Sequence, residues 1–126
     1  MKRTGFLMLA LLWLVAAFVL QAQTLIPRPE PPRLVNDLAG VLSSSEVQAL
    51  EDKLVAFNDS TSNQIAVLIV NDLQGYDRSD FAFKVANDWG IGQGEFNNGV
   101  LVLVKPKTPS SDGRVFIATG SGLEGA

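Results

Sequence analysis

The sequence predicts an α/β fold in which a mixed sheet of at least three strands carries helices on its faces. Two apolar runs, 65–70 and 100–104, show no polar alternation, which is typical of strands covered on both faces. A segment with helical periodicity separates them, and such a unit joins parallel strands by a right-handed crossover. A third apolar run, 114–119, follows without a helix, so the last two strands should be antiparallel.

The chain begins with the organisation of a secretory signal peptide. Lys2 and Arg3 form a basic start, residues 5–20 carry no charge, and Ala22 offers a small residue for cleavage. We expect residues 1–22 to be removed, which takes the net charge from −3 to −5. An uncleaved anchor helix is the alternative. In either case the domain is expected outside the cytoplasm, in the periplasm or the cell envelope.

Residues 23–33 are predicted to form a proline-rich linker. They hold four of the six prolines, and proline interrupts both helices and interior strands. We therefore expect a polyproline-like tether, followed by a folded domain over residues 34–126.

The first helix is predicted from a capping box. Ser43 and Glu46 have the S-x-x-E spacing in which each side chain accepts a hydrogen bond from the backbone N–H of the other. The helix that follows should bury one apolar stripe, and the polar run 58–63 should end it. The stripe consists of Val47, Leu50, Leu54 and Phe57.

The second helix is predicted between Asp77, which can cap its start, and Gly90, which can end it in the left-handed conformation. Its buried face should consist of Phe81, Val85 and Trp89, supported by Ala82 and Ala86.

The last residues, 120–126, match the dinucleotide-binding pattern G-x-G-x-x-G. That pattern belongs to the turn after the first strand, and here it follows the third, so we interpret it as a tight turn and predict no nucleotide site. Such a turn should lead into another element, so we expect the sequence to be a fragment of a longer domain.

The composition excludes several classes of function. Without cysteine or histidine there are no disulfides, thiol nucleophiles, histidine general bases or most transition-metal sites. An acidic chain without a Lys/Arg cluster argues against nucleic-acid binding. The remaining chemistry depends on oxygen-bearing side chains and backbone groups.

Such side chains stand at the ends of the predicted elements. Asp37 precedes the first helix, Asp88 lies in the last turn of the second, Asn97 and Asn98 precede the second strand, and Glu124 follows the third. Singly, each is explained as a turn or cap residue. Together, Asp37, Asp88, Asn98 and Glu124 form a candidate site for Ca²⁺ or Mg²⁺, and a cation would offset the unfavourable place of Asp88 at the negative end of a helix dipole.

Five sequence blocks in this order resemble those of the TPM domain family, which is named for a thylakoid lumen protein, a photosystem II repair protein and a receptor modulator. The blocks are LVNDLAGVLS (34–43), NQIAV (63–67), NDWGIG (87–92), NGVLVL (98–103) and GSGLE (120–124). The resemblance implies a three-layer α/β/α sandwich with a small mixed sheet, Rossmann-like. It also implies an extracytoplasmic domain that in bacteria is often followed by a membrane helix, and it agrees with a C-terminal truncation.

The resemblance also bears on function. The plant member is associated with calcium binding and acid phosphatase activity, while others look like adaptors that assemble or maintain membrane complexes. Many members have Asp-Asn-Gly where this chain has Asn97-Asn98-Gly99, so one carboxylate is lost.

We therefore expect a module that binds a partner protein or a divalent cation such as Ca²⁺, near a membrane complex. The alternative is a metal-assisted acid phosphatase, in which a cation on Asp37 and Asp88 activates water and Asn98 contacts the phosphoryl oxygens. No catalytic residue is identified. A third possibility is that an edge of the sheet accepts a strand from a partner.

Overall fold

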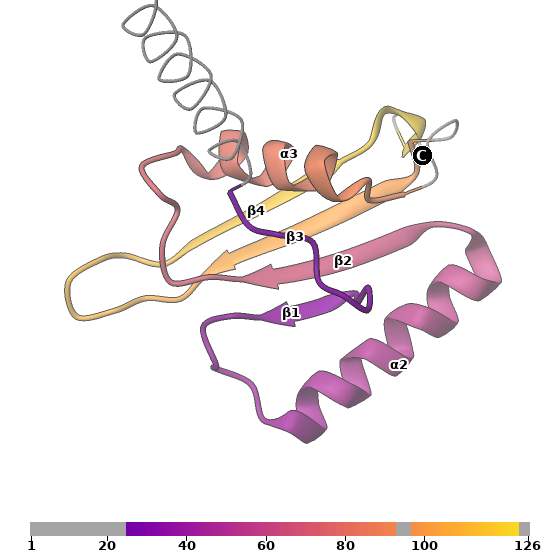
Figure 1. Ribbon diagram of the computed structural model, residues 1–126, viewed down its shortest axis with the longest axis horizontal. Helices are drawn as coiled ribbons and strands as arrows, with labels where there is room; N and C mark the ends of the chain where they lie inside the picture. Colours follow the sequence, from indigo (N-terminus) through magenta and orange to yellow (C-terminus); the bar gives the residue numbers. More distant parts are fainter. Residues whose placement is uncertain (1–24, 93–96, 124–126) are drawn as a thin grey trace, which may run out of the picture.

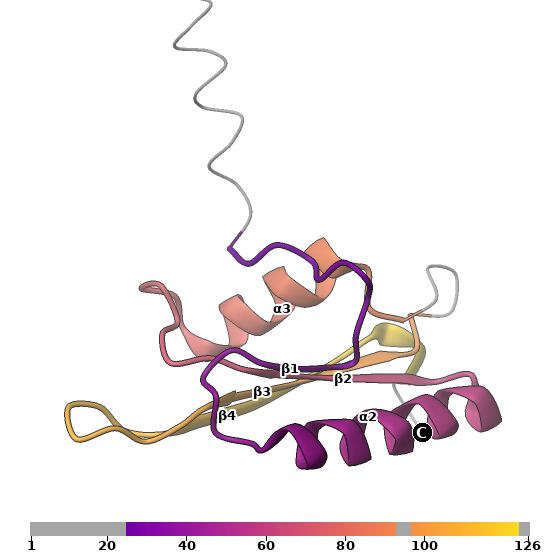
Figure 2. The ribbon, with the colours of Figure 1, turned by 60° about the horizontal axis from the view of Figure 1, so that its bottom comes forward.

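The computed structural model describes residues 25–92 and 97–123 (Figure 1). They form a four-stranded sheet with strand order β1-β2-β3-β4, in which β1, β2 and β3 are parallel and β4 is antiparallel to β3. Helix α2 lies on one face of the sheet and α3 on the other (Figure 2), which confirms the three-layer α/β/α sandwich. The elements are β1 (Val35–Asp37), α2 (Ser44–Thr61), β2 (Gln64–Ile69), α3 (Arg78–Trp89), β3 (Gly99–Lys105), β4 (Arg114–Thr119) and a 3₁₀ turn, η1 (Ser121–Leu123).

The three predicted strands and both helices are present, and the antiparallel pairing of the last two strands is confirmed. The additional strand is β1, whose three residues pair in parallel with Val67, Leu68 and Ile69. A strand of this length is too short to show a period of its own in the sequence.

The two parallel connections have opposite hands. Strands β1, β2 and β3 lie side by side in sequence order, yet the helices that join them cover opposite faces (Figures 1 and 2). The connection through α3 has the predicted right-handed crossover, so the connection through α2 is left-handed, which is rare among parallel strands.

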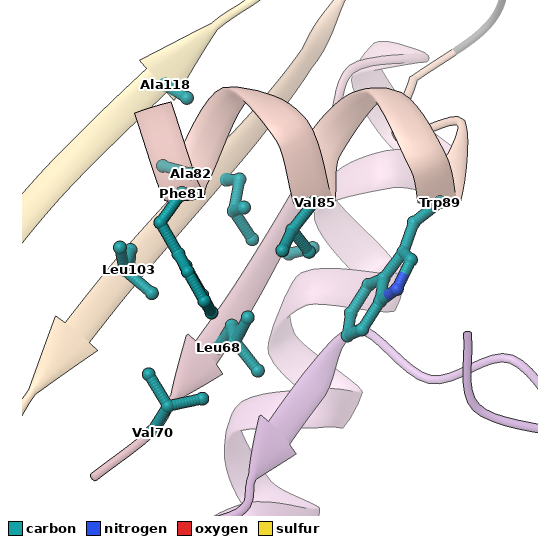
Figure 3. Packing of buried hydrophobic residues seen from close by; sticks show 10 residues of the cluster. Leu68, Val70, Phe81, Ala82, Val85, Trp89, Leu103 and Ala118 are labelled. Atoms are coloured by element: carbon teal, nitrogen blue, oxygen red, sulfur yellow. The ribbon is translucent and has the colours of Figure 1, made fainter. Parts of the chain in front are cut away.

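The main core lies between α3 and the sheet (Figure 3). The side chains of Phe81 and Ala82 are fully buried, and Val85 and Trp89 nearly so, as predicted. They pack on residues of β2, β3 and β4 that share one face of the sheet: Ala66, Leu68, Leu101, Leu103 and Ala118. Gly90 ends α3 in the left-handed conformation, with φ 63°, because glycine has no β-carbon to oppose it.

The capping box at the start of α2 is confirmed. The backbone N–H of Ser43 donates to the Glu46 carboxylate at 2.9 Å, and the N–H of Glu46 donates to the Ser43 hydroxyl at 3.1 Å. The predicted buried stripe is incomplete, however. Leu54 is buried, whereas Phe57 is 38% exposed. Helix α2 packs on β1 and β2, at one side of the sheet.

This capping box makes part of the stability depend on pH. The hydrogen bonds from the backbone N–H of Ser43 and then from its side chain hold the pKa of Glu46 below its usual 4.5. A carboxylate whose pKa is lowered by folding stabilises the protein above its unfolded pKa, and that contribution is lost as the pH falls through the folded value. We expect the free energy of unfolding to fall less steeply in Glu46→Gln than in the wild type between about pH 5 and about pH 2. Urea denaturation measures both curves, and parallel curves would contradict the prediction.

Part of the predicted linker packs against the domain. We name residues 25–33 the strap, because they cross the α3 face of the sheet before β1 (Figure 2). The carbonyl of Ile26 accepts a hydrogen bond from Trp89 Nε1 at 2.9 Å, and the carbonyl of Leu25 accepts one from Gln74 Nε2 at 2.9 Å. The side chains of Leu25 and Ile26 also pack against the core, so this part of the predicted linker is held against the domain.

The predicted signal peptide, residues 1–22, lies outside the described residues. Among those described, no helix is long and apolar enough to span a membrane.

Candidate functional site

The predicted metal ligands lie at two different ends of the sheet. Asp37 is the last residue of β1, and its register partner Ile69 ends β2. Its two carboxylate oxygens accept the backbone N–H groups of Val41 at 3.2 Å and Leu42 at 2.7 Å. Asp37 therefore closes the turn that leads from β1 into α2.

Asn98 lies at the other end, directly before β3. The side chain is buried at 7% exposure, and its Nδ2 donates to the carbonyl of Ser62. The backbone carbonyl of Asn98 accepts a hydrogen bond from the backbone N–H of Gln64 at 3.2 Å. Asn98 thus ties the start of β3 to the turn between α2 and β2.

Asp88 lies near the Asn98 end, because α3 runs antiparallel to the strands (Figure 1). Its Oδ2 forms an ion pair with Lys84 Nζ at 3.3 Å, one helical turn earlier. This ammonium group offsets the negative charge of Asp88 at the helix C-terminus, by at most about 0.5 kcal/mol for an exposed pair. The fourth predicted ligand, Glu124, lies outside the described residues.

The described ligands do not form one cation site. Asp37 pairs with Ile69 of β2, and Ile69 pairs with Val104 near the C-terminal end of β3. Asn98, in contrast, directly precedes Gly99, the first residue of β3. At about 3.3 Å per residue, the six residue steps from Asn98 to Val104 separate the two positions by roughly 20 Å. In the described part of the chain, no three acidic side chains are placed to hold a metal ion. The same separation parts the two carboxylates that the phosphatase hypothesis needs, so no catalytic step is derived from them.

The Asn98 end is built from close backbone contacts between glycines. A β-carbon on Gly92 would lie 2.5 Å from the N of Gly99, and one on Gly120 would overlap the carbonyl oxygen of Asn97. A cavity of about 300 Å³ opens beside these glycines, under α3. Its lining residues carry no charge; they are Phe83, Ala86, Asn87, Gly90, Ile91, Gly92, Asn97, Gly99, Ala118, Thr119 and Gly120. Among the described residues, the cavity is therefore lined by amide, hydroxyl and backbone groups and by no acid or base.

Within residues 25–92 and 97–123, an exposed apolar surface lies on the opposite face of the sheet. Ala118 of β4 packs into the α3 core, and Phe116 contacts Phe83 of α3 with ring centroids 5.7 Å apart. Because side chains alternate along a strand, Val115 and Ile117 point to the other face, where they are 59% and 57% exposed.

The neighbouring strand extends this surface. Register places Val104 beside Val115 and Val102 beside Ile117, and both β3 valines are partly exposed. We name this surface the β3/β4 face; it consists of Val100, Val102, Val104, Val115 and Ile117. Among the described elements, helix α2 packs chiefly on β1 and β2, so most of the β3/β4 face lies beyond it. The sequence predicted that β3 would be covered on both faces, and in the described structure it is covered on one.

The edge of β4 has free hydrogen-bonding groups. The N–H of Gly120 donates to the carbonyl of Gly99 at 2.9 Å, so these two residues form a hydrogen-bonded pair. Hydrogen-bonded and non-hydrogen-bonded pairs alternate along an antiparallel ladder. Val115, Ile117 and Thr119 therefore belong to non-hydrogen-bonded pairs, and their backbone N–H and C=O groups point away from β3.

Three cations, Lys105, Lys107 and Arg114, stand at the hairpin end of β3 and β4. Lys105 donates to the hydroxyl of Ser111 and to the carbonyl of Asp112, and Arg114 donates to the carbonyl of Gly113 at 2.9 Å. Neither these two side chains nor Lys107 has a carboxylate within 4.0 Å in the described structure. Lys105 and Arg114 alternate with Val104 and Val115, so their side chains belong to the α3 face of the sheet and not to the β3/β4 face.

Comparison with known proteins places the chain among relatives of similar fold. A model of the TPM domain matches residues 35–126. The solution NMR structure of the N-terminal domain of a protein from P. gingivalis is 34% identical, with a TM-score of 0.63. The match covers 74% of this chain and 57% of the P. gingivalis domain, so this chain spans little more than half the length of that domain. No curated protein matches the chain.

Proposed function

The chain belongs to the TPM domain family, and on that premise we propose that it is an extracytoplasmic module that binds a partner protein on its β3/β4 face. The observation that carries the proposal is the exposure of Val115 and Ile117, at 59% and 57%, beside the partly exposed valines of β3. Isolated exposed apolar side chains are ordinary, but a contiguous group beside an open strand edge is typical of an interaction surface.

The partner that suits this surface is an extended segment that pairs with β4. The outward N–H and C=O groups of Val115, Ile117 and Thr119 supply the ladder. Every second residue of the segment would be apolar and would continue the β3/β4 face.

The expected affinity is moderate. Covering the exposed part of an isoleucine or valine gains on the order of 1 kcal/mol, and each added backbone hydrogen bond gains about 0.5–1.5 kcal/mol. The gains from a few residues are similar in size to the cost of association, which is about 4–15 kcal/mol. A reversible complex is therefore expected, which is suited to a module that assists the assembly or maintenance of a membrane complex.

The cellular location belongs to the same proposal. The basic and then uncharged start of the chain supports secretion across the cytoplasmic membrane, to the periplasm or the cell envelope. The partner would then be an envelope protein or a membrane complex with an exposed extended segment.

Photo-crosslinking from two positions tests the proposal. A photoreactive amino acid replaces Ile117 on the β3/β4 face or, as the control, Asp52 on the exposed side of α2. In the native host we expect a defined adduct from position 117 and none from position 52. The adduct is identified by mass spectrometry, and its protein is purified for binding measurements.

Binding of that purified partner should depend on the β3/β4 face. We expect Ile117→Asp to weaken it at least about tenfold, because a carboxylate would have to be dehydrated against valines. Lys84→Gln, on α3, should leave binding unchanged. Thermal melting checks that both variants are folded. Adducts at both positions, an adduct with a second copy of the chain, or unchanged affinity in Ile117→Asp would contradict the proposal.

A further inference from the structure

A second cavity lies at the opposite edge of the sheet, beneath the strap. It has a volume of about 240 Å³ and is enclosed by the strap, α2, the start of β2 and the end of α3. It exists because β1 is short. Val35 is the first residue of β1 to pair with β2, at Val67, so β1 does not continue beside Gln64 and Ala66. The strap, which is held to Trp89 at Ile26, crosses this gap before it reaches β1.

The cavity carries a positive charge. Arg28 and Arg33 line it, and within residues 25–92 and 97–123 neither guanidinium lies within 4.0 Å of a carboxylate. Glu51 also lines it, but its carboxylate accepts the backbone N–H groups of Leu34 at 3.0 Å and Val35 at 2.7 Å. Two cations and one anion leave a net charge of +1, which suits a monoanion better than a dianion.

The rest of the lining is mixed. Pro29, Pro32, Val55, Ile91 and Trp89 contribute carbon surface, and Asn58 and Gln64 contribute amide groups. The indole of Trp89 is fixed by its hydrogen bond to Ile26, so its ring is already positioned without a ligand. Since one water occupies about 30 Å³ of liquid, the cavity has room for about eight, or for a small aromatic acid.

We propose that this cavity binds a small organic monocarboxylate with an apolar body. The carboxylate lies between the guanidinium groups of Arg28 and Arg33, which can each offer two parallel N–H donors. The apolar body lies against Trp89 and the strap prolines. This site is independent of the β3/β4 face, because the two lie at opposite edges of the sheet.

Titration of the full chain with benzoate tests the inference, with the Trp89 indole N–H followed by NMR. The chain has two tryptophans, so Trp13→Phe assigns the Trp89 resonance. We expect a saturable shift with benzoate and none with benzamide, which has the same shape without the charge. Inorganic phosphate should compete less well than benzoate at neutral pH.

Arginine variants complete the test. Arg28→Gln and Arg33→Gln should each weaken benzoate binding by about tenfold, the value of one charge-assisted hydrogen bond. Lys107→Gln removes the same charge at the distant hairpin and should have no effect. An unchanged free resonance shows that the strap remains in place in each variant. The inference is overturned by equal shifts with benzamide, by no shift with benzoate, by tighter phosphate binding, or by an equal loss in Lys107→Gln.

Discussion

Replacement of Phe81 by alanine is expected to lower the free energy of unfolding by about 3–5 kcal/mol. Phe81 is fully buried between α3 and the sheet, where it packs with Leu68, Leu103 and Val70 (Figure 3). Truncation removes a large apolar side chain and leaves a cavity that neighbouring strands cannot close. Denaturation in urea gives the change directly, with an unaltered slope if the variant unfolds in the same way.

Phe83 is the matched control on the same helix. Its side chain is 51% exposed, and its ring meets that of Phe116 edge-on. We expect Phe83→Ala to cost about 1 kcal/mol, mainly for the lost aromatic pair. Equal losses in the two variants would show that α3 does not bury the face described above.

Gly120→Ala is expected to cost about 3 kcal/mol or more, although it adds a single methyl group. The new β-carbon would overlap the carbonyl oxygen of Asn97. That carbonyl also accepts the N–H of Gly122 at 3.2 Å, so moving it breaks a second contact. Because the alanine β-carbon is fixed by its own backbone and Asn97 O is a backbone atom, no side-chain rotation can relieve the clash.

Gly113 provides the comparison for this substitution. A β-carbon there would approach the carbonyl of Lys105 at 3.4 Å, which is close to ordinary contact. Gly113→Ala should therefore change the free energy of unfolding by less than about 0.5 kcal/mol. A Gly120→Ala protein as stable as Gly113→Ala would contradict the packing of the glycine cluster.

Much of the fold could be predicted from local signals. The Ser43 and Glu46 spacing located the first helix, and Asp77 with Gly90 located both ends of the second. Each of these signals depends on residues within a turn of each other. Strand β1 could not be predicted in the same way, because three residues pair through partners that lie more than thirty positions away.

The candidate site was less predictable, because it depends on where elements end in space. Asp37 and Asn98 both flank strands, but one follows its strand and the other precedes it. In a parallel arrangement these positions lie at opposite ends of the sheet. The β3/β4 face was missed for a related reason, since a run of valines does not reveal how far a helix reaches across a sheet. The strap cavity combines residues from four segments, and no single segment carries a motif for it.

Amide hydrogen exchange of β4, with and without the bound partner, tests the central claim most directly. In the free protein the outward amides of Val115, Ile117 and Thr119 should exchange rapidly, because they point away from β3. We expect these three amides to become protected in the complex, while those on the exposed side of α2 do not change. Protection confined to α2 or to the strap, with β4 unchanged, would contradict it.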